Sequence, residues 1–312
     1  MSNEKYHMTN LNKGINIAII TAIISGFSVF LNKFAVDFWK NSSVFTSAKN
    51  IFVALMLSVI VLGFNRANLL KLNKKDWYKL AFLGLLGGSI PFLLFFKGLT
   101  LIPAVNAAFI QKTLFVWVAI LAFSLLKEKI GRAQLMALGV MLLSVVLLGI
   151  PAKIQFGYGE FLVLIAALMW SVETLYVQKL MKNISAMTAA WARMFFGSIF
   201  LMGYLATQGT VSQIIPTSSA QLFWIAVSSV FLFAYITTFY SAIKYASATY
   251  ATSVLVIATP ITIILNYTFT SGKLPAGFLF ALVFAVSGVV ILKANRYFTS
   301  LSPALLEEVA TD

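Results

Sequence analysis

Five charged side chains stand out inside long apolar stretches of this sequence, where a charge is costly unless it is paired or solvated. They are Lys49, Lys97, Lys112, Glu173 and Arg193. Lys112 is the most deeply placed, because it follows the start of its apolar stretch by about eight residues, or roughly 12 Å of helix. We expect Lys112 to line a polar cavity and to contact a carboxylate or phosphate of a ligand. The alternative is a structural lysine that bonds to backbone carbonyls.

Lys49 and Lys97 lie closer to the ends of their apolar stretches, so their long side chains can reach water. For Lys97 we expect that outcome. Lys49 differs because Ala48-Lys49 aligns with Ala192-Arg193 when the two halves of the chain are compared. A basic residue at the same place in both halves indicates a role tied to the repeated architecture, and a lysine that reaches water stays open as the alternative.

Glu173 is the one acidic residue well inside an apolar stretch, and Arg193 lies at a similar depth in the next stretch. We expect an ion pair between them, because either charge alone would be poorly solvated. The pair either joins two helices structurally or acts as a gate or proton-sensitive switch at one end of a pathway. The sequence leaves both interpretations open.

Polar and aromatic side chains near these charges complete the candidate ligand site. Gln111 directly precedes Lys112, and Trp170 and Thr174 lie within four residues of Glu173. Two further polar candidates come from later apolar stretches. The predicted substrate-binding residues are Lys112, Gln111, Lys49, Trp170, Thr174, Tyr240 and Asn266.

Two features predict how the apolar helices bend and pack. Pro260 falls in the middle of a stretch, where it should kink the helix and provide either a hinge or a static bend. Gly84 and Gly88 are four residues apart in another stretch. Small residues at this spacing let two helix backbones approach closely in lipid, so we expect a packing seam there.

The sequence shows no catalytic or metal-binding pattern. The chain has no cysteine, and its single histidine, His7, lies in the polar N-terminal tail. It has no glycine-rich phosphate loop, no nucleophile beside a histidine and no paired-carboxylate motif. We therefore expect neither an enzyme nor a bound metal or cofactor.

The bilayer is the expected solvent for this chain. Of its 312 residues, 60% are hydrophobic and 10% are charged, whereas soluble domains contain about 25% charged residues. A membrane-spanning helix needs roughly 20 apolar residues. Such stretches lie at about 15–36, 44–63, 78–99, 104–126, 131–150, 157–180, 187–206, 222–243, 248–270 and 275–294. The predicted fold class is an all-α integral membrane protein with ten transmembrane helices.

A net charge of +14 is also found in proteins that bind nucleic acid, but here the distribution of the charges indicates membrane orientation instead. With the N-terminus in the cytoplasm, 15 lysines and arginines fall on the inside and four on the outside. Basic residues concentrate in the cytoplasmic loops of membrane proteins. We therefore expect both termini in the cytoplasm and no binding to nucleic acid.

The chain divides into two similar halves. Residues 98–108 in the first half resemble residues 242–252 in the second. Each half contains five apolar stretches, so the second half inserts with the opposite orientation. We predict cytoplasmic tails at 1–14 and 295–312 and five-helix repeats at 15–150 and 157–294. Two inverted repeats around a central site are typical of secondary transporters.

These motifs, in their order and doubling, resemble the drug/metabolite transporter superfamily, and within it the EamA-type ten-helix transporters. In the first half the resemblance rests on Lys49, residues 98–108 and Glu128. In the second half the matching positions are Trp170, Ala192-Arg193, residues 242–245, Ala251 and Pro260. The resemblance implies transport of small organic metabolites, commonly amino acids and their relatives, without ATP.

Three positions depart from the family pattern. Phe115 stands where a proline is expected in the fourth stretch, and Lys273 stands where the second repeat has a glutamate. Lys112 is unusual for a central cavity that is mostly uncharged in the family. The substrates of particular relatives therefore do not transfer to this chain.

The sequence thus predicts a secondary transporter, in the export direction, in the bacterial cytoplasmic membrane. It would move a small organic metabolite such as an amino acid or related carboxylate by alternating access. The anionic substrate is expected because basic residues outnumber acidic ones inside the stretches. Uptake or exchange of a nucleotide-like or S-adenosylmethionine-like metabolite is one alternative, and a membrane scaffold without transport is another. The predicted partners are a small-molecule substrate and the lipid bilayer, and a homodimer is one arrangement that the sequence allows.

Overall fold

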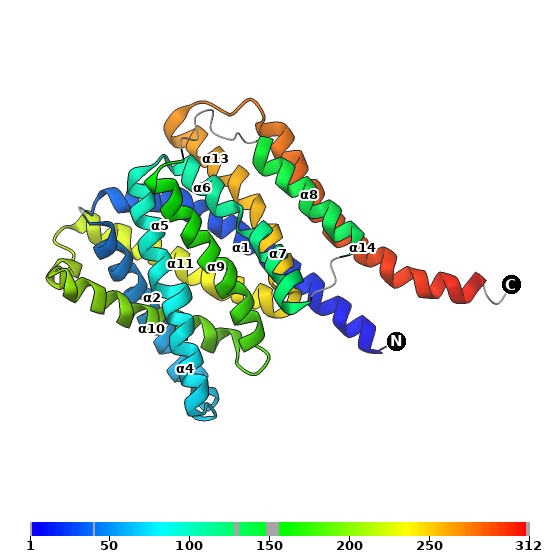
Figure 1. The fold of residues 1–312 in the computed structure, drawn as a ribbon, viewed down its shortest axis with the longest axis horizontal. Coiled ribbons are helices and arrows are strands. Elements are labelled where there is room, and N and C mark those ends of the chain that lie inside the picture. The colour runs from blue at the N-terminus through cyan, green and yellow to red at the C-terminus, as the bar shows by residue number, and fades with distance from the viewer. Residues whose placement is uncertain (1, 40, 128–130, 148–155, 310–312) are drawn as a thin grey trace.

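The computed structural model describes residues 2–39, 41–127, 131–147 and 156–309. Throughout this part of the chain the structure consists of helices and short connections, without a β-strand. Figure 1 shows the helices crossing in a bundle, with both terminal helices reaching out on one side. The predicted all-α fold class is confirmed.

The first half of the chain supplies the helices up to α8. Several of them are short because the expected spans are interrupted. The elements are α1 (Ser2–Asp37), α2 (Ser42–Phe64), α3 (Arg66–Leu70), α4 (Lys74–Leu83), the π-helical turn η1 (Gly84–Ser89), α5 (Ile90–Leu101), α6 (Ala104–Lys112), α7 (Leu114–Leu126) and α8 (Arg132–Leu147).

The second half has a similar order of long and interrupted helices. Its elements are α9 (Tyr158–Leu180), α10 (Ala186–Thr207), the 3₁₀ turn η2 (Val211–Ile214), α11 (Ser219–Ala246), α12 (Ala248–Val254), the 3₁₀ turn η3 (Leu255–Ile257), α13 (Ala258–Asn266), the π-helical turn η4 (Tyr267–Ser271) and α14 (Phe278–Val309).

Within the described residues, eight helices are long and apolar enough to cross a membrane. The fifth and tenth predicted spans appear instead as shorter apolar helices, Arg132–Leu147 and Phe278–Ala294. The fifth was expected to continue to residue 150, but residues 148–150 lie outside the described chain. α8 and α14 pack against each other, as Figure 1 shows, and Ser144 Oγ donates a 2.6 Å hydrogen bond to the Ala281 carbonyl.

Pro260 lies one turn after the 3₁₀ segment η3, which interrupts the ninth span. Proline has no N–H to donate to the carbonyl four residues earlier, which belongs to Val256 within η3. The irregularity expected around Pro260 is therefore present, while its role as a hinge stays a prediction. The fourth span is interrupted at Thr113, without a proline.

The third span changes to π-helical geometry at η1, where α10 packs closely against it. A Cβ atom at Gly88 would collide with the Arg193 carbonyl oxygen and lie 3.1 Å from Gly197 Cα. Asn50 Nδ2 from α2 donates a 2.9 Å hydrogen bond to the Gly88 carbonyl. The packing seam predicted from Gly84 and Gly88 is confirmed, and it brings Arg193 next to the interrupted third span.

Replacing Gly88 with alanine should destabilise the protein by about 1–3 kcal/mol, because backbone atoms of α10 at Arg193 and Gly197 leave the new methyl group no room. The measurement is the thermal unfolding midpoint of the purified protein in detergent. Gly203→Ala is the matched control, since a Cβ there meets no heavy atom within 4 Å. Equal midpoints for the two variants would contradict the tight seam.

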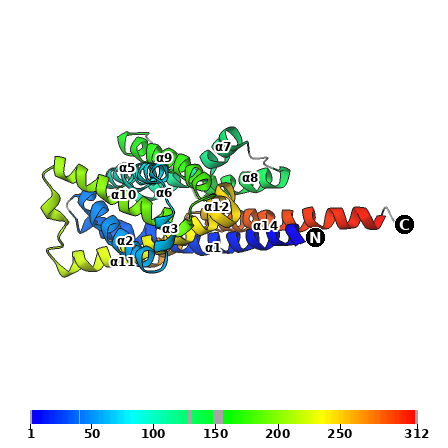
Figure 2. The same ribbon diagram turned by 90° about the horizontal axis from the view of Figure 1, so that it is seen from below.

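The connections gather at two opposite ends of the bundle. At one end, Lys13 Nζ lies 3.3 Å from the Tyr245 hydroxyl and Lys293 Nζ lies 2.9 Å from Asn16 Oδ1. At the other end, Gln221 Nε2 in the first turn of α11 donates to the Phe38 carbonyl at 3.2 Å, joining α11 to the α1–α2 connection. Figure 2 shows both termini at one end and the α10–α11 connection at the other.

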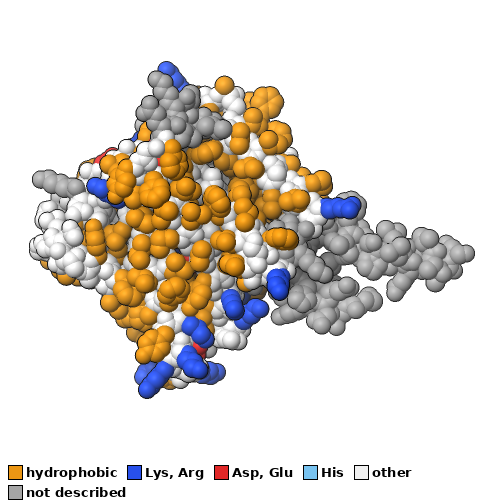
Figure 3. Space-filling view, viewed as in Figure 1, with side chains coloured by type: hydrophobic (Ala, Val, Ile, Leu, Met, Phe, Trp, Pro, Cys, Tyr) orange, Lys and Arg blue, Asp and Glu red, His pale blue; other side chains and the backbone are white. Residues whose placement is uncertain are grey.

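The surface between the two ends is apolar. Figure 3 shows hydrophobic side chains across the middle of one face and lysines and arginines mainly along its lower and right edges. Large exposed apolar side chains such as Val59, Phe123 and Leu279 belong to this surface. A soluble protein rarely exposes so extensive an apolar surface, so these side chains face lipid.

Candidate functional site

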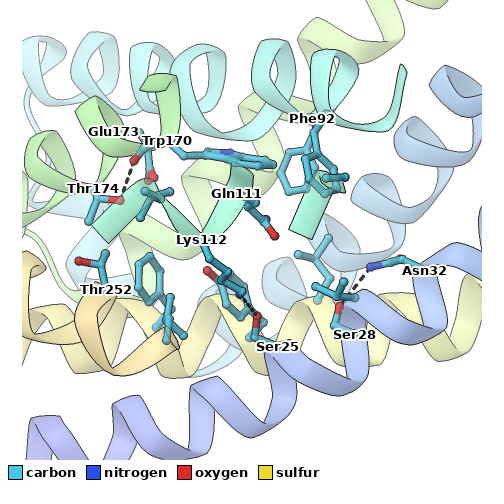
Figure 4. Close-up of a pocket in the computed structure, with 18 of the residues that line it drawn as sticks. Ser25, Ser28, Asn32, Phe92, Gln111, Lys112, Trp170, Glu173, Thr174 and Thr252 are labelled. Carbon is cyan, nitrogen blue, oxygen red and sulfur yellow. Dashed lines mark hydrogen bonds between the residues drawn. The ribbon is translucent and has the colours of Figure 1, made fainter. Parts of the chain in front are cut away.

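A cavity of about 100 Å³ lies between the two halves of the chain. Figure 4 shows it bounded by α1 on one side and by Trp170 and Phe92 on the other. Most of its wall is apolar and aromatic, and the polar side chains come from seven helices. They are Ser25, Ser28, Asn32, Lys49, Gln111, Lys112, Glu173, Thr174, Arg193, Tyr235 and Thr252.

Lys112 reaches this cavity from the point where the fourth span is interrupted. It is the last residue of α6, and the Thr113 hydroxyl stabilises the break by donating a 2.7 Å hydrogen bond to the Ile110 carbonyl. The Lys112 side chain is 7% exposed, and its Nζ lies 3.4 Å from Ser25 Oγ on α1. Figure 4 shows it pointing across the cavity toward that serine.

Lys49 is buried more completely, since only 1% of it is exposed. Its Nζ lies 3.2 Å from Asn32 Oδ1 and 4.1 Å from the centroid of the Phe96 ring. A cation over a ring face is stabilised by the ring quadrupole. The structure therefore excludes the alternative in which Lys49 reaches water, whereas Lys97 is exposed as expected.

Neither buried lysine has an acidic partner in the described part of the chain, where no carboxylate oxygen lies within 4.0 Å of Lys49 Nζ or Lys112 Nζ. Each ammonium group has three N–H donors, and each contacts one neutral oxygen on α1. Each lysine thus has one polar contact with the protein, but no acidic side chain among the described residues compensates its positive charge.

A polar stripe on α1 holds both lysines, and sequence analysis missed it. Ser25, Ser28 and Asn32 have the spacing i, i+3, i+7, which places them on one face of the helix. Asn32 Nδ2 donates a 3.2 Å hydrogen bond to Ser28 Oγ, so the stripe is connected internally. The signal was visible in the sequence as three polar residues at helical spacing in an apolar span.

Glu173 and Arg193 form the second polar group of the cavity. Arg193 Nη1 lies 3.7 Å from Glu173 Oε1, and the Tyr240 hydroxyl also donates a hydrogen bond to that oxygen. Both charged side chains are buried, with 1% of Glu173 and 4% of Arg193 exposed. The carboxylate charge is thus compensated in place, unlike the charges of the two lysines.

The π-helical turn η1 anchors this ion pair. Its Gly87 carbonyl accepts hydrogen bonds from Arg193 Nη2 at 3.0 Å and from Trp170 Nε1 at 3.1 Å. A Cβ atom at Gly87 would lie 2.6 Å from Glu173 Cγ. The wider π-helical turn therefore provides an acceptor oxygen that a regular helix would use internally, and glycine provides the space for the pair.

The structure brings most of the predicted site residues around this one cavity. Those on its wall are Lys49, Gln111, Lys112, Trp170, Thr174, Glu173 and Arg193. Tyr240 is instead buried behind the wall, where it bonds to Glu173. Asn266 ends α13 and Pro260 is buried in the same helix, and neither is on the cavity wall. Contact with a substrate stays a prediction for all of them.

The sequence resemblance also singled out Phe115 and Glu128, and the structure describes only the first of them. Phe115, at the place of the expected proline, is buried on the cavity wall. Glu128 lies outside the described residues. The fourth span is interrupted close to Phe115 even though no proline is present.

Comparisons with known proteins agree with this architecture. Residues 12–150 and 157–294 each match the EamA-like transporter family. An uncharacterized transporter of Clostridium kluyveri is 27% identical over 236 residues, which cover 71% of this chain and 74% of that protein.

A solved crystal structure superimposes on this chain with a TM-score of 0.67 at 14% sequence identity. That match covers 88% of this chain and 95% of the other, so the fold is shared. The chain is a multi-pass membrane protein that belongs to the EamA-like transporter family.

Proposed function

We propose that this protein is a secondary transporter that exports a small organic anion, such as an amino acid or related carboxylate, by alternating access. The observation that carries the proposal is the pair of buried lysines, Lys49 and Lys112, in a cavity between the two halves of the chain. A buried charge without a partner is costly, and a bound anion relieves that cost. A scaffold without transport has no need for such a pair.

The interrupted helices support alternating access. The fourth span is interrupted at Thr113 and the ninth at η3, and each is the fourth of five spans in its half. Lys112 and Leu114 on one side and Thr252 and Leu255 on the other line the cavity. Discontinuous helices from two repeats that meet at a central site are a recurring feature of secondary transporters.

The dimensions of the cavity favour a substrate of amino-acid size over a nucleotide-like or S-adenosylmethionine-like metabolite. Its volume of about 100 Å³ is below the ~300–1,000 Å³ of sites for drug-sized ligands. Gln111 Oε1 is buried and accepts no hydrogen bond from the described residues. An ammonium group of an amino acid would supply the missing donor.

The function is tested with everted membrane vesicles from bacteria that overproduce the protein. We expect saturable uptake of at least one acid from a panel of labelled amino and organic acids, since everted vesicles convert export into uptake. Vesicles containing Lys112→Met at the same protein level are the control. Equal uptake by both preparations, for every acid in the panel, would remove the basis for the proposal.

We also propose that both termini face the cytoplasm of a bacterial cell, which the charge distribution supports. Ser212 is exposed in the α10–α11 connection, and Ala67 is exposed in α3 at the opposite end. In this cysteine-free chain, an impermeant thiol reagent should label Ser212→Cys in intact cells and Ala67→Cys only after lysis. The reverse pattern would show that the protein inserts the other way.

A further inference from the structure

The two uncompensated lysines are separated along α1 by a distance that limits the shape of the substrate. Lys112 Nζ contacts Ser25 and Lys49 Nζ contacts Asn32, seven residues further on the same helix. Seven residues of α-helix rise roughly 10 Å. The two positions on α1 that the ammonium groups contact are therefore on the order of 10 Å apart along the helix, whereas the two oxygens of one carboxylate lie side by side.

The remaining charges of the cavity do not change this arrangement. Glu173 would repel a bound anion, but Arg193 compensates its charge and the Tyr240 hydroxyl donates a hydrogen bond to it. Among the described residues of the wall, the cavity thus has an excess of two positive charges, one toward each end of the α1 stripe. A substrate with two negative charges would neutralise both.

The wall opposite the α1 stripe is aromatic. Trp170 lies with its ring centroid 5.3 Å from that of Phe92, and both rings face the cavity. Figure 4 shows these two side chains on the side opposite Ser25 and Asn32. An apolar wall along the space between two cationic positions suits a short hydrocarbon chain between two anionic groups.

We propose that the cavity binds a substrate with a carboxylate at each end, namely a dicarboxylate of four or five carbons or its α-amino form. Carboxylate oxygens at the two ends of such a molecule are roughly 5–7 Å apart, and each charge-assisted N–H···O contact adds roughly 2.8 Å. The sum, roughly 11–13 Å, is close to the separation of the two positions on α1 that the lysines contact. This inference rests on the proposed function, because it names the substrate class of the same site.

The test compares ligands on the purified full-length protein by its thermal unfolding midpoint. A ligand that binds the folded state raises the midpoint according to its concentration and affinity. The probes are succinate and glutarate, their matched monocarboxylates butyrate and pentanoate, and sulfate as a compact dianion, all at equal ionic strength. We expect succinate or glutarate to bind at least about tenfold more tightly than its monocarboxylate and than sulfate.

Two variants test whether the lysines cause the preference for a dicarboxylate. Lys112→Met and Lys49→Met should each reduce the preference for the dicarboxylate to within about threefold, since one carboxylate loses its partner. Lys97→Met, which removes an exposed lysine outside the cavity, should keep the full preference. The ranking of ligands on the unmodified chain is decisive if a variant does not fold.

The outcomes separate this inference from the proposed function. Equal binding of glutarate and pentanoate, or of glutarate and sulfate, would overturn the two-ended substrate. If Lys112-dependent transport of monocarboxylates were found at the same time, the proposed function would stand. If no acid bound to the protein and none was transported, both proposals would fail together.

Discussion

Replacing Lys112 with methionine should abolish most transport while leaving the protein folded and inserted in the membrane. Lys112 is 7% exposed, and its ammonium group contacts one serine hydroxyl and has no carboxylate partner among the described residues. Losing one charge-assisted contact to a bound anion costs about 1.5–3 kcal/mol, which corresponds to a loss of about 10–100-fold in affinity. Initial rates of substrate uptake in everted vesicles measure the effect.

The same substitution should leave thermal stability equal or higher, and this distinguishes a substrate contact from a structural lysine. Removing a buried charge without a partner relieves a desolvation cost, and methionine fills a similar volume. Lys97→Met provides the matched control for the loss of a lysine, because Lys97 is exposed. A Lys112→Met protein that transports at the unmodified rate would refute the role of this residue, and one that unfolds would favour the structural alternative.

Separating Glu173 from Arg193 should produce the largest loss of stability in this protein. Both side chains are buried, and each substitution, Glu173→Gln or Arg193→Gln, leaves the other charge without its partner. Breaking a buried pair on one side typically costs about 3–5 kcal/mol. The double variant should recover part of that loss, with a coupling energy of at least about 1 kcal/mol. Thermal unfolding midpoints of the four proteins in detergent give this cycle.

The structure predicts that the cycle is asymmetric. Arg193 also donates to the Gly87 carbonyl of η1, so Arg193→Gln removes a second contact that Glu173→Gln preserves. Tyr240→Phe removes the other donor to Glu173 and should cost less than either charge substitution, because one hydrogen bond to a charged group contributes about 1.5–3 kcal/mol and both charges stay paired. Strictly additive effects would mean that Glu173 and Arg193 act separately, and Glu173 would then be the candidate for a lone proton site.

Hydropathy and charge along the sequence were sufficient for the fold class and for most of the helices. The apolar stretches must lie in lipid because 60% of the residues are hydrophobic, and a helix satisfies its own backbone hydrogen bonds there. The same reasoning identified Lys49, Lys112, Glu173 and Arg193, since a charge in an apolar stretch needs a partner or a cavity. These inferences depend on one-dimensional properties of the chain, and tertiary packing does not change them.

The tertiary structure decided how these residues combine. Hydropathy left open whether Lys49 reaches water, whereas in the structure its ammonium group lies over Phe96 and bonds to Asn32. The spacing of the α1 stripe is visible in the sequence, but which side chains meet Asn32 is not. The break at Thr113 had no signal, because no proline lies there. In lipid, the rotation of a helix about its own axis is set by packing against neighbouring helices, since every face of an apolar span is compatible with the solvent. The cavity, its two uncompensated lysines and the anchoring of Arg193 on Gly87 therefore depend on contacts between distant segments, which the order of residues alone does not reveal.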